Sequence, residues 1–268
     1  MDASITTPTL FPPLGSQDRA EDVGFRFGAK GTHSSRTMMF EELRLVLNAA
    51  PAEAKRADYA AAIIDGNCLS KPTSSTRRLT NQRLGELYGL DPSIVLFRVL
   101  RRLWGVDAEG RPLLALLAAL ARDPLLASTL PAVVLLPFGA ELQREPMKRA
   151  VRAFVGGRMN ESIVEKVCRN AASTWTQSGH LIGRTFKKRH AVTASPATAA
   201  FAIYLAHAAG FRGAEIFACG WLRTLDCDPS RGRHLALEAK RIGLLDLRIS
   251  GDIIELNLSR LDPNYARV

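Results

Sequence analysis

The pattern that most constrains the fold of this chain lies near its C-terminal end, where two helical segments precede two short strands. Apolar residues recur at helical spacing over residues 213–222 and 229–242, and Gly243 is a suitable helix stop. Residues 244–249 and 253–258 then alternate apolar and polar side chains around a glycine-containing turn, as in a β-hairpin. Two helices followed by a hairpin predict a winged helix-turn-helix unit.

One long stretch of the chain carries positive charge and no negative charge. Residues 166–214 contain no Asp or Glu, although the whole chain has 26 acidic residues. Its densest basic group is Arg184, Lys187, Lys188 and Arg189. Each Lys or Arg placed near a phosphate releases condensed counterions, so this segment favours binding to a polyanion. A solvated basic loop without a binding role is the alternative interpretation.

A second nucleic-acid-binding pattern lies before residue 90. Helical segments separated by tight turns are predicted over residues 36–48, 54–64 and 73–87, which is the layout of a helix-turn-helix. The third segment would present side chains that match base edges: Arg77, Arg78, Asn81, Gln82 and Arg83. The second helix of the C-terminal unit would present Arg231, Arg233 and His234. A solvated helix face explains the residues of the third segment equally well.

The rest of the chain predicts further helices and no repeat. Helical patterns also cover residues 93–104, 113–121, 140–155, 160–172 and 196–209. We therefore expect a mostly α protein, a helical bundle with a helix-turn-helix-like unit near the N-terminus and a winged-helix unit with a small β-hairpin near the C-terminus. Its expected parts are a flexible arm over residues 1–36, an N-terminal helical domain over 37–157 and a C-terminal winged-helix-like domain over 158–268.

Charge and composition narrow the functional classes. The formal net charge is +10, which favours nucleic acid or another anionic partner. The most apolar stretch, residues 112–136, is interrupted by Arg122, Asp123 and prolines, so we expect no membrane span, and the N-terminus has no secretory-signal pattern. The four cysteines fit neither a disulfide framework nor zinc-site spacing, and buried thiols of a cytoplasmic protein fit them best.

No catalytic, cofactor or metal signature stands out in the sequence. The chain has no Walker loop, no dinucleotide-binding glycine motif and no HExxH motif. Asp226 and Asp228 have the spacing of some metal ligands, but Asp228 precedes Pro229 and is better explained as a helix N-cap. His180 is expected to be a polar loop residue. We therefore expect a protein that is not an enzyme and that uses neither a cofactor nor a metal.

Several stretches resemble one protein family in pattern and in order. They are residues 36–47, 64–69 with Lys71, 75–78 and 122–126. Together they resemble BrxA, a small helical protein of bacteriophage-exclusion (BREX) defence systems. The resemblance implies an all-helical fold, sometimes described as NusB-like, with helix-turn-helix or winged elements. It also implies DNA binding, methyltransferase and ATPase partners, and a place for Thr76, Arg77 and Arg78 in an N-terminal DNA-binding unit.

The sequence thus predicts a non-enzymatic component of an anti-phage system that binds double-stranded DNA mainly through phosphates. Lys187, Lys188 and Arg189 are the expected phosphate contacts. Two alternatives remain open: an adaptor whose basic surface meets an acidic protein, and an RNA-binding protein, as the NusB-like description suggests. Aromatic residues make up 7% of the chain and form no ladder, which disfavours stacking on single strands.

Overall fold

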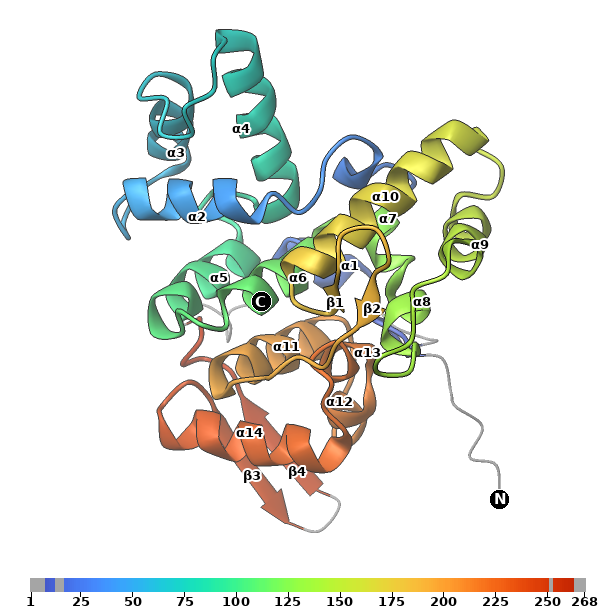
Figure 1. Ribbon diagram of the computed structural model, residues 1–268. Helices are drawn as coiled ribbons and strands as arrows, with labels where there is room; N and C mark the ends of the chain where they lie inside the picture. The colour runs from blue at the N-terminus through green and yellow to red at the C-terminus, as the bar shows by residue number, and fades with distance from the viewer. Residues whose placement is uncertain (1–7, 13–16, 251–252, 263–268) are drawn as a thin grey trace.

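The computed structural model describes residues 8–12, 17–250 and 253–262, and it shows a mostly helical protein, as the sequence predicts (Figure 1). The longer helices are α2 (Phe40–Ala49), α3 (Arg56–Ile64), α4 (Ser74–Tyr88), α5 (Val95–Val106), α6 (Arg111–Arg122), α9 (Arg144–Val155), α10 (Glu161–Gln177), α11 (Pro196–Ala208) and α14 (Pro229–Arg241). Shorter ones are α1 (Gln17–Val23), the 3-10 turn η1 (Thr32–Ser34), α7 (Pro124–Ala127), α8 (Leu130–Val134), α12 (Glu215–Ala218) and α13 (Gly220–Arg223). Two antiparallel strand pairs complete the fold: β1 (Leu181–Ile182) with β2 (Lys188–Arg189), and β3 (Asp246–Ser250) with β4 (Ile253–Asn257).

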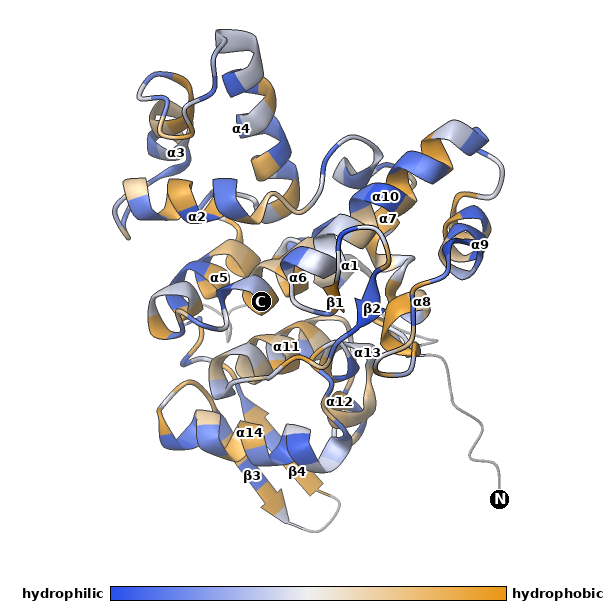
Figure 2. Ribbon diagram, viewed as in Figure 1, coloured by the Kyte–Doolittle hydropathy of each residue, from blue (hydrophilic) through white to orange (hydrophobic). Residues whose placement is uncertain are grey.

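The helices α6 and α11 form the centre of the molecule. Residues 113–122 of α6 are all buried, and α11 is buried along nearly its whole length. Figure 2 shows where the hydrophobic residues lie along the helices. A helix that is apolar on every side must be covered on every side, and the many alanines of α11 let neighbouring helices approach closely. The same cluster of buried side chains includes Leu117 before residue 156 and Trp221 after it. The two domains expected from the sequence therefore share one hydrophobic core.

The described part of the N-terminal segment is packed, so the expected flexible arm is a wrong prediction there. The ring of Phe25 lies edge-on to Phe11 and to Trp221, with centroid distances of 5.7 Å in both pairs. Aromatic side chains carry a large apolar area, and these few are enough to anchor a segment that is otherwise rich in proline and glycine. Residues 1–7 and 13–16 of the predicted arm lie outside the described residues.

The C-terminal hairpin is confirmed, but the helix expected over residues 213–222 is not continuous. It is divided into α12 and α13 at Cys219, whose backbone is extended. The N-terminal segment explains the break, because the backbone N–H of Gly220 donates a hydrogen bond of 2.8 Å to the carbonyl of Thr9. A Cβ on Gly220 would lie 2.5 Å from that oxygen, so the close approach requires glycine.

The apolar helices at the centre of the molecule are too short to span a membrane singly. Within the described residues, no single helix is long and apolar enough to cross a membrane. The segments 111–122 and 124–134 reach the necessary length and composition only as a pair, and they are bent by 105° relative to each other.

Candidate nucleic-acid interface

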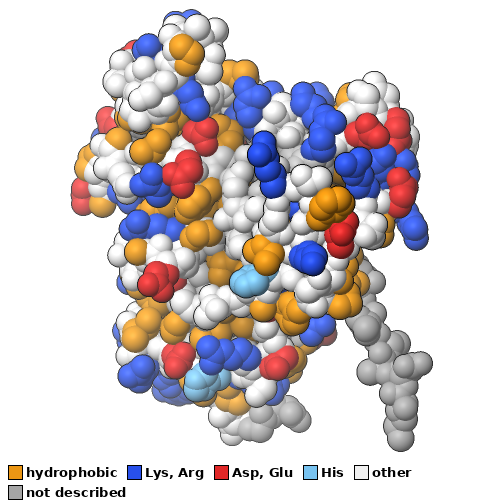
Figure 3. Space-filling view, in the orientation of Figure 1, with side chains coloured by type: hydrophobic (Ala, Val, Ile, Leu, Met, Phe, Trp, Pro, Cys, Tyr) orange, Lys and Arg blue, Asp and Glu red, His pale blue; other side chains and the backbone are white. Residues whose placement is uncertain are grey.

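A groove with basic walls opens between α9, α10 and the loop that joins β1 to β2. Lys and Arg side chains gather over these elements in the space-filling view (Figure 3). The groove encloses about 460 Å³, and the charged residues that line it are Arg144, Lys148, Glu165, Arg169, Arg184 and Lys187. Five described basic side chains from three elements thus face a single carboxylate across one concave surface. Such a surface focuses a positive potential and attracts anions.

The hairpin on one side of the groove is held in place by its backbone. Strand β2 pairs with β1, and its other edge meets the segment that precedes α9. There the N–H of Gly139 donates to the carbonyl of Arg189 at 2.8 Å, and the N–H of Arg189 donates to Ala140 at 2.9 Å. The N–H of Leu142 donates to the carbonyl of Lys187 at 2.8 Å. Because β2 is bonded along both edges, the connecting loop is fixed over the groove. The sequence did not predict this hairpin, since two-residue strands show no alternating pattern.

The opposite wall consists of α9 packed against α10. A small hydrophobic cluster joins the two helices, formed by Leu125, Val151, Val155, Val164 and Val167. At the surface, Lys148 Nζ lies 2.8 Å from Glu165 Oε1. This hydrogen bond raises the pKa of Lys148 above its ordinary value. Lys148 Nζ also lies 3.8 Å from Glu145 and 3.7 Å from Glu161. Lys148 is therefore charged but compensated by three carboxylates, and the unbalanced charge of the groove comes from the arginines and Lys187.

Two residues of the predicted basic segment, Arg184 and Lys188, lie in the groove or at its rim with their charge available. Arg184 is exposed and has no ion-pair partner among the described residues, and the same is true of Lys188 on β2. Lys187 is half-buried, and its Nζ donates to Thr176 Oγ1 of α10 at 2.7 Å. Burial lowers the pKa of Lys187. Lys187 therefore both lines the groove and ties the loop to α10.

Arg189 corrects the expectation that this whole basic segment faces solvent. Its side chain is 1% exposed and forms an ion pair with Asp226. Its Nε also donates to the carbonyl of Val133 at 3.1 Å. A guanidinium enclosed by these partners does not reach a phosphate at the surface, so we remove Arg189 from the candidate contacts. The alternation of strand β2 places Lys188 outward and Arg189 inward.

On α4, much of the predicted base-reading set has structural partners. Arg77 donates to the carbonyls of Lys71 and Ile64, at 3.2 and 3.1 Å, and so holds the turn between α3 and α4. Thr76 lies in the first turn of the helix, where its N–H donates to the side chain of Thr73 at 3.2 Å. These contacts stabilise the helix start, which the sequence assigned to DNA recognition.

The next turn of α4 is organised around one acid. Glu86 accepts a hydrogen bond from Gln82 at 3.0 Å and pairs with Arg83 at 2.7 Å. Burial would raise the pKa of Glu86, but the hydrogen bonds from Arg83 and Thr32 outweigh it and the pKa lies below its ordinary value. A charged carboxylate therefore lies beside Gln82 and Arg83. Among the predicted arginines of this helix, Arg78 is exposed and has no ion-pair partner among the described residues.

The third predicted set, on α14, is exposed but distant from the groove. Arg231, Arg233 and His234 all lie at the surface. Arg233 also lies over the ring of Phe217, and His234 is 3.4 Å from Glu238. In Figure 1, α14 lies at the bottom of the molecule, whereas α4 and α10 lie near the top. The structure thus brings Arg184 and Lys187 together in one groove with α9 and α10, and it leaves the other sets apart.

Two sequence interpretations of single residues are settled by the local geometry. Asp228 is the N-cap of α14, because its side chain accepts a hydrogen bond from the N–H of Arg231 at 2.8 Å. Asp226 and Asp228 belong to no metal-binding group, since no cluster of His, Cys, Asp and Glu in the described part of the chain is arranged to hold a metal ion. His180 lies in the loop between α10 and β1, as expected, but it is buried, and its Nε2 lies 2.6 Å from the carbonyl oxygen of Thr224.

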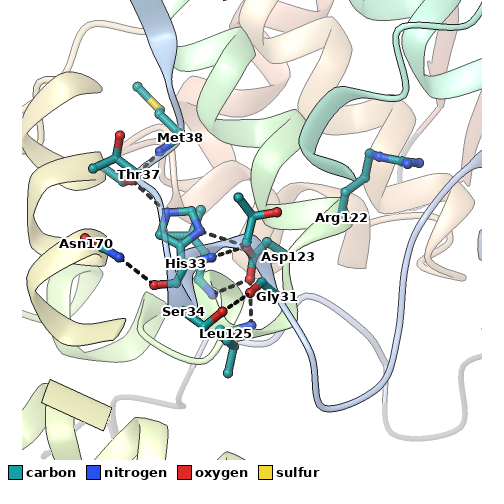
Figure 4. A network of polar contacts seen from close by, with 12 residues as sticks. Gly31, His33, Ser34, Thr37, Met38, Arg122, Asp123, Leu125 and Asn170 are labelled. Atoms are coloured by element: carbon teal, nitrogen blue, oxygen red, sulfur yellow. Dashed lines mark hydrogen bonds and ion pairs between the residues drawn. The ribbon is translucent and has the colours of Figure 1, made fainter. Parts of the chain in front are cut away.

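A buried polar network has the order of a catalytic triad, and it was not predicted. His33 Nδ1 lies 2.8 Å from Asp123 Oδ2, and His33 Nε2 lies 2.7 Å from Thr174 Oγ1 (Figure 4). Carboxylate, imidazole and hydroxyl in this order activate nucleophiles elsewhere. Here all three residues are buried, and Thr174 Oγ1 already accepts the N–H of Met38 at 2.8 Å. We therefore interpret the network as a structural link between η1, α7 and α10.

The electrostatics of this network agree with a structural role. Burial by itself would raise the pKa of Asp123, but its charge interaction and hydrogen bonds with His33 outweigh burial and lower the pKa. Asp123 Oδ1 also caps α7 by accepting from Leu125 at 3.0 Å and from Leu126 at 3.2 Å. Asn170 of α10 donates to the carbonyl of His33 at 2.8 Å. Each polar atom thus has a partner within the protein.

Comparisons with known proteins identify no family for this chain. No family model matches the chain, and no curated protein matches it. The functional assignment therefore depends on the groove itself. Three of its basic residues, Arg144, Lys148 and Arg169, were not predicted as site residues. The four-residue spacing of Arg144 and Lys148 places both on one face of α9, and this was the available signal.

Proposed function

We propose that this protein binds double-stranded DNA, mainly through phosphate contacts, at the basic groove between α9, α10 and the β1–β2 loop. The observation that supports this proposal is the convergence of five basic side chains with one acid. Exposed basic residues continue beyond the groove, at Lys188 on β2, Arg149 on α9 and Lys166 on α10. A basic surface that extends past its groove suits a long polyanion better than a small anionic ligand.

We propose two weaker contact regions that correspond to the predicted DNA-binding units. The first is the helix-turn-helix-like arrangement of α2, α3 and α4, with Arg78 exposed on α4. The second is the winged-helix-like arrangement of α14 with β3 and β4, with Arg231 and Arg233 exposed. Both regions lie apart from the groove. One duplex would therefore reach them as well only if it extended along the molecule or if it were bent.

The biological role that we propose is that of a non-enzymatic component of a BREX-type anti-phage system. The resemblance to BrxA supports this role, together with the positive groove and the buried state of the triad-like network. DNA-bound protein would then act beside methyltransferase and ATPase partners. No covalent step is assigned to the groove. Its thiol, Cys168, stays protonated at neutral pH because burial raises its pKa to about 11.

The proposal is tested by removing two exposed groove charges. We would measure the binding of a random-sequence duplex by fluorescence anisotropy at roughly 50 to 300 mM salt, for the wild type and for Arg144→Ala/Arg184→Ala. The slope of log K against log salt should become less steep by about 1.8, since each neutralised phosphate contributes about 0.9. Arg19→Ala/Arg102→Ala removes the same charge from exposed positions on α1 and α5 and serves as the control.

Three results would contradict the proposal. One is an absence of salt-dependent duplex binding by the wild type. Another is an equal change of slope in the groove variant and the control, which would assign the effect to net charge alone. The third is tighter binding of single-stranded RNA than of duplex under the same conditions, which would favour the RNA-binding alternative.

A further inference from the structure

The loop between β1 and β2 presents a large aromatic side chain to solvent beside the basic groove. Phe186 is 69% exposed, although aromatic rings are among the residues that gain most from burial. Its neighbours Arg184, Thr185 and Lys187 all line the groove. The ring is therefore an apolar group at the rim of a positively charged surface.

The position of Phe186 is fixed by the backbone of the loop. Gly183 has a φ of 106°, a conformation that side chains other than glycine rarely adopt. A Cβ on Gly183 would lie 2.2 Å from the carbonyl oxygen of Phe186. On the other side of Phe186, the carbonyl of Lys187 accepts a hydrogen bond from the N–H of Leu142 at 2.8 Å, and the Nζ of Lys187 donates to Thr176 Oγ1. The ring thus projects from a rigid base.

Further apolar side chains lie on the same structural unit. Ile182 of β1 is 51% exposed, and Phe138, beside the segment that pairs with β2, is 64% exposed. Phe138 carries the guanidinium of Arg189 at 5.1 Å from its ring centroid. Figure 3 shows hydrophobic side chains next to Lys and Arg side chains on this face. The sequence indicated no aromatic ladder and did not single out Phe186, so this combination is a finding of the structure.

We propose that Phe186 is an apolar wedge that inserts between two base pairs of a duplex bound at the basic groove. This inference rests on the proposed function. Apolar side chains that unstack a base step kink the duplex by about 20–90°, and the kink brings more of the DNA into contact with the protein. Arg184 and Lys187, on either side of the ring in the chain, are placed to meet the phosphates that flank the opened step.

Charge complementarity favours duplex DNA as the partner that binds at the rim of the groove. An apolar ring among cations suits a partner with a stacked apolar interior and a negatively charged exterior, and duplex DNA has both. The bend would help α4 or α14 to reach the same duplex, since neither lies beside α9 in Figure 1.

The test measures bending and unstacking separately from phosphate binding. A duplex of about 25 base pairs carries one central TA step, because pyrimidine–purine steps are the most easily kinked. Dyes at its ends report bending by energy transfer, and 2-aminopurine in place of the central adenine reports loss of stacking. The wild type should shorten the end-to-end distance and increase the 2-aminopurine fluorescence.

Three variants distinguish a wedge from a general effect of hydrophobicity. Phe186→Ala should lose both signals and keep the salt slope, with affinity lower by roughly threefold to tenfold, since lost burial is partly offset by unstacking that no longer occurs. Phe186→Leu keeps an apolar wedge and should retain most of both signals. Val106→Ala removes another exposed apolar side chain, 52% exposed at the end of α5 and outside the proposed contact regions, and should behave as the wild type.

The outcomes separate this inference from the proposed function. A wild type that does not bind the duplex in a salt-dependent way contradicts the proposed function itself. A wild type that binds with the expected slope but leaves the duplex straight contradicts the wedge alone, as does a Phe186→Ala variant that still bends it. A single strand that binds more tightly than the duplex, with a loss on Phe186→Ala, would mean stacking on unpaired bases and would also overturn the wedge.

Discussion

Arg189 and Asp226 form a buried ion pair that joins strand β2 to the turn after α13. The two residues are 37 positions apart in the chain, and their side chains are 1% and 10% exposed. Asp226 Oδ2 also accepts the N–H of Val192 at 2.9 Å. Arg189 follows the exposed Lys188 directly, so adjacent positive charges in one basic segment have opposite roles. One stabilises the fold, and the other is available to a partner.

The first prediction compares these neighbours. Arg189→Ala leaves Asp226 buried without its counter-charge, and removing one member of a buried pair costs about 3–5 kcal/mol of unfolding free energy. Lys188→Ala changes an exposed residue and should alter stability by no more than about 0.5 kcal/mol. Urea unfolding of both variants measures the difference. Equal midpoints would show that the Arg189 pair contributes nothing, contrary to this expectation.

This comparison shows why the sequence could predict the helices but only part of the site. Helical periodicity is local, so α4, α10 and α14 follow from the spacing of their own apolar residues. The burial of Arg189 depends on Asp226, 37 residues away, and on a strand of two residues. Charge density alone cannot distinguish an inward arginine from an outward lysine, so the sequence could not show that Arg189 is buried while Lys188 is exposed.

The groove and the N-terminal segment show the same limit. Arg144 and Arg169 lie 25 positions apart, and only the packing of α9 on α10 brings them to one surface. Phe25 belongs to a segment whose glycines and prolines predict disorder, yet its ring meets Trp221, which is nearly 200 positions later. Exposure of Phe186 follows from the Gly183 turn, which no local pattern indicated.

A second prediction concerns the buried network of His33, Asp123 and Thr174. Thr174→Val keeps the shape of the side chain but removes the hydroxyl that serves both His33 Nε2 and the N–H of Met38. Each buried polar group left without a partner costs about 1–3 kcal/mol, so the loss of two partners should lower the unfolding free energy by roughly 2–6 kcal/mol. Thermal or urea unfolding provides the measurement. Thr193→Val, at an exposed loop position, is the matched control and should change little.

The loop glycine gives a third prediction. Gly183→Ala forces a Cβ against the carbonyl of Phe186 at a φ of 106°, so the loop must rearrange or store strain of about 1–3 kcal/mol. Duplex affinity should fall because Arg184 and Lys187 lose their positions. Gly105→Ala is the control, since a Cβ there meets nothing within 4 Å and alanine favours a helix by about 0.5–1 kcal/mol. Wild-type DNA affinity in Gly183→Ala would contradict a fixed loop.

A fourth prediction uses the buried imidazole of His180. Its Nε2 faces the carbonyl of Thr224, its Nδ1 lies 2.9 Å from Ser178 Oγ, and its ring lies edge-on to Trp175 at 4.9 Å. Burial is the main cause that lowers the pKa of His180 to about 4, and the charge of Arg189 acts in the same direction. The folded protein therefore holds a neutral ring that donates from Nε2.

The sign of the pH dependence follows from comparison with the unfolded chain, where a histidine titrates near 6.5. Above that pH both states are neutral and the stability contribution is complete. Between about pH 6.5 and 4 only the unfolded state binds a proton, so unfolding becomes easier by up to about 3 kcal/mol as the pH falls. Below the folded pKa the loss levels off.

His180→Gln tests this directly, because the glutamine amide can still donate to Thr224 but does not titrate. Urea unfolding at pH 7.0, 5.5 and 4.5 should show a smaller loss of stability in the variant than in the wild type, although the variant starts from a lower value. His207, whose pKa burial also lowers to about 4, remains in both proteins, so the difference between the two curves isolates His180. Parallel curves would mean that the pKa of His180 is not lowered in the folded protein, contrary to this expectation.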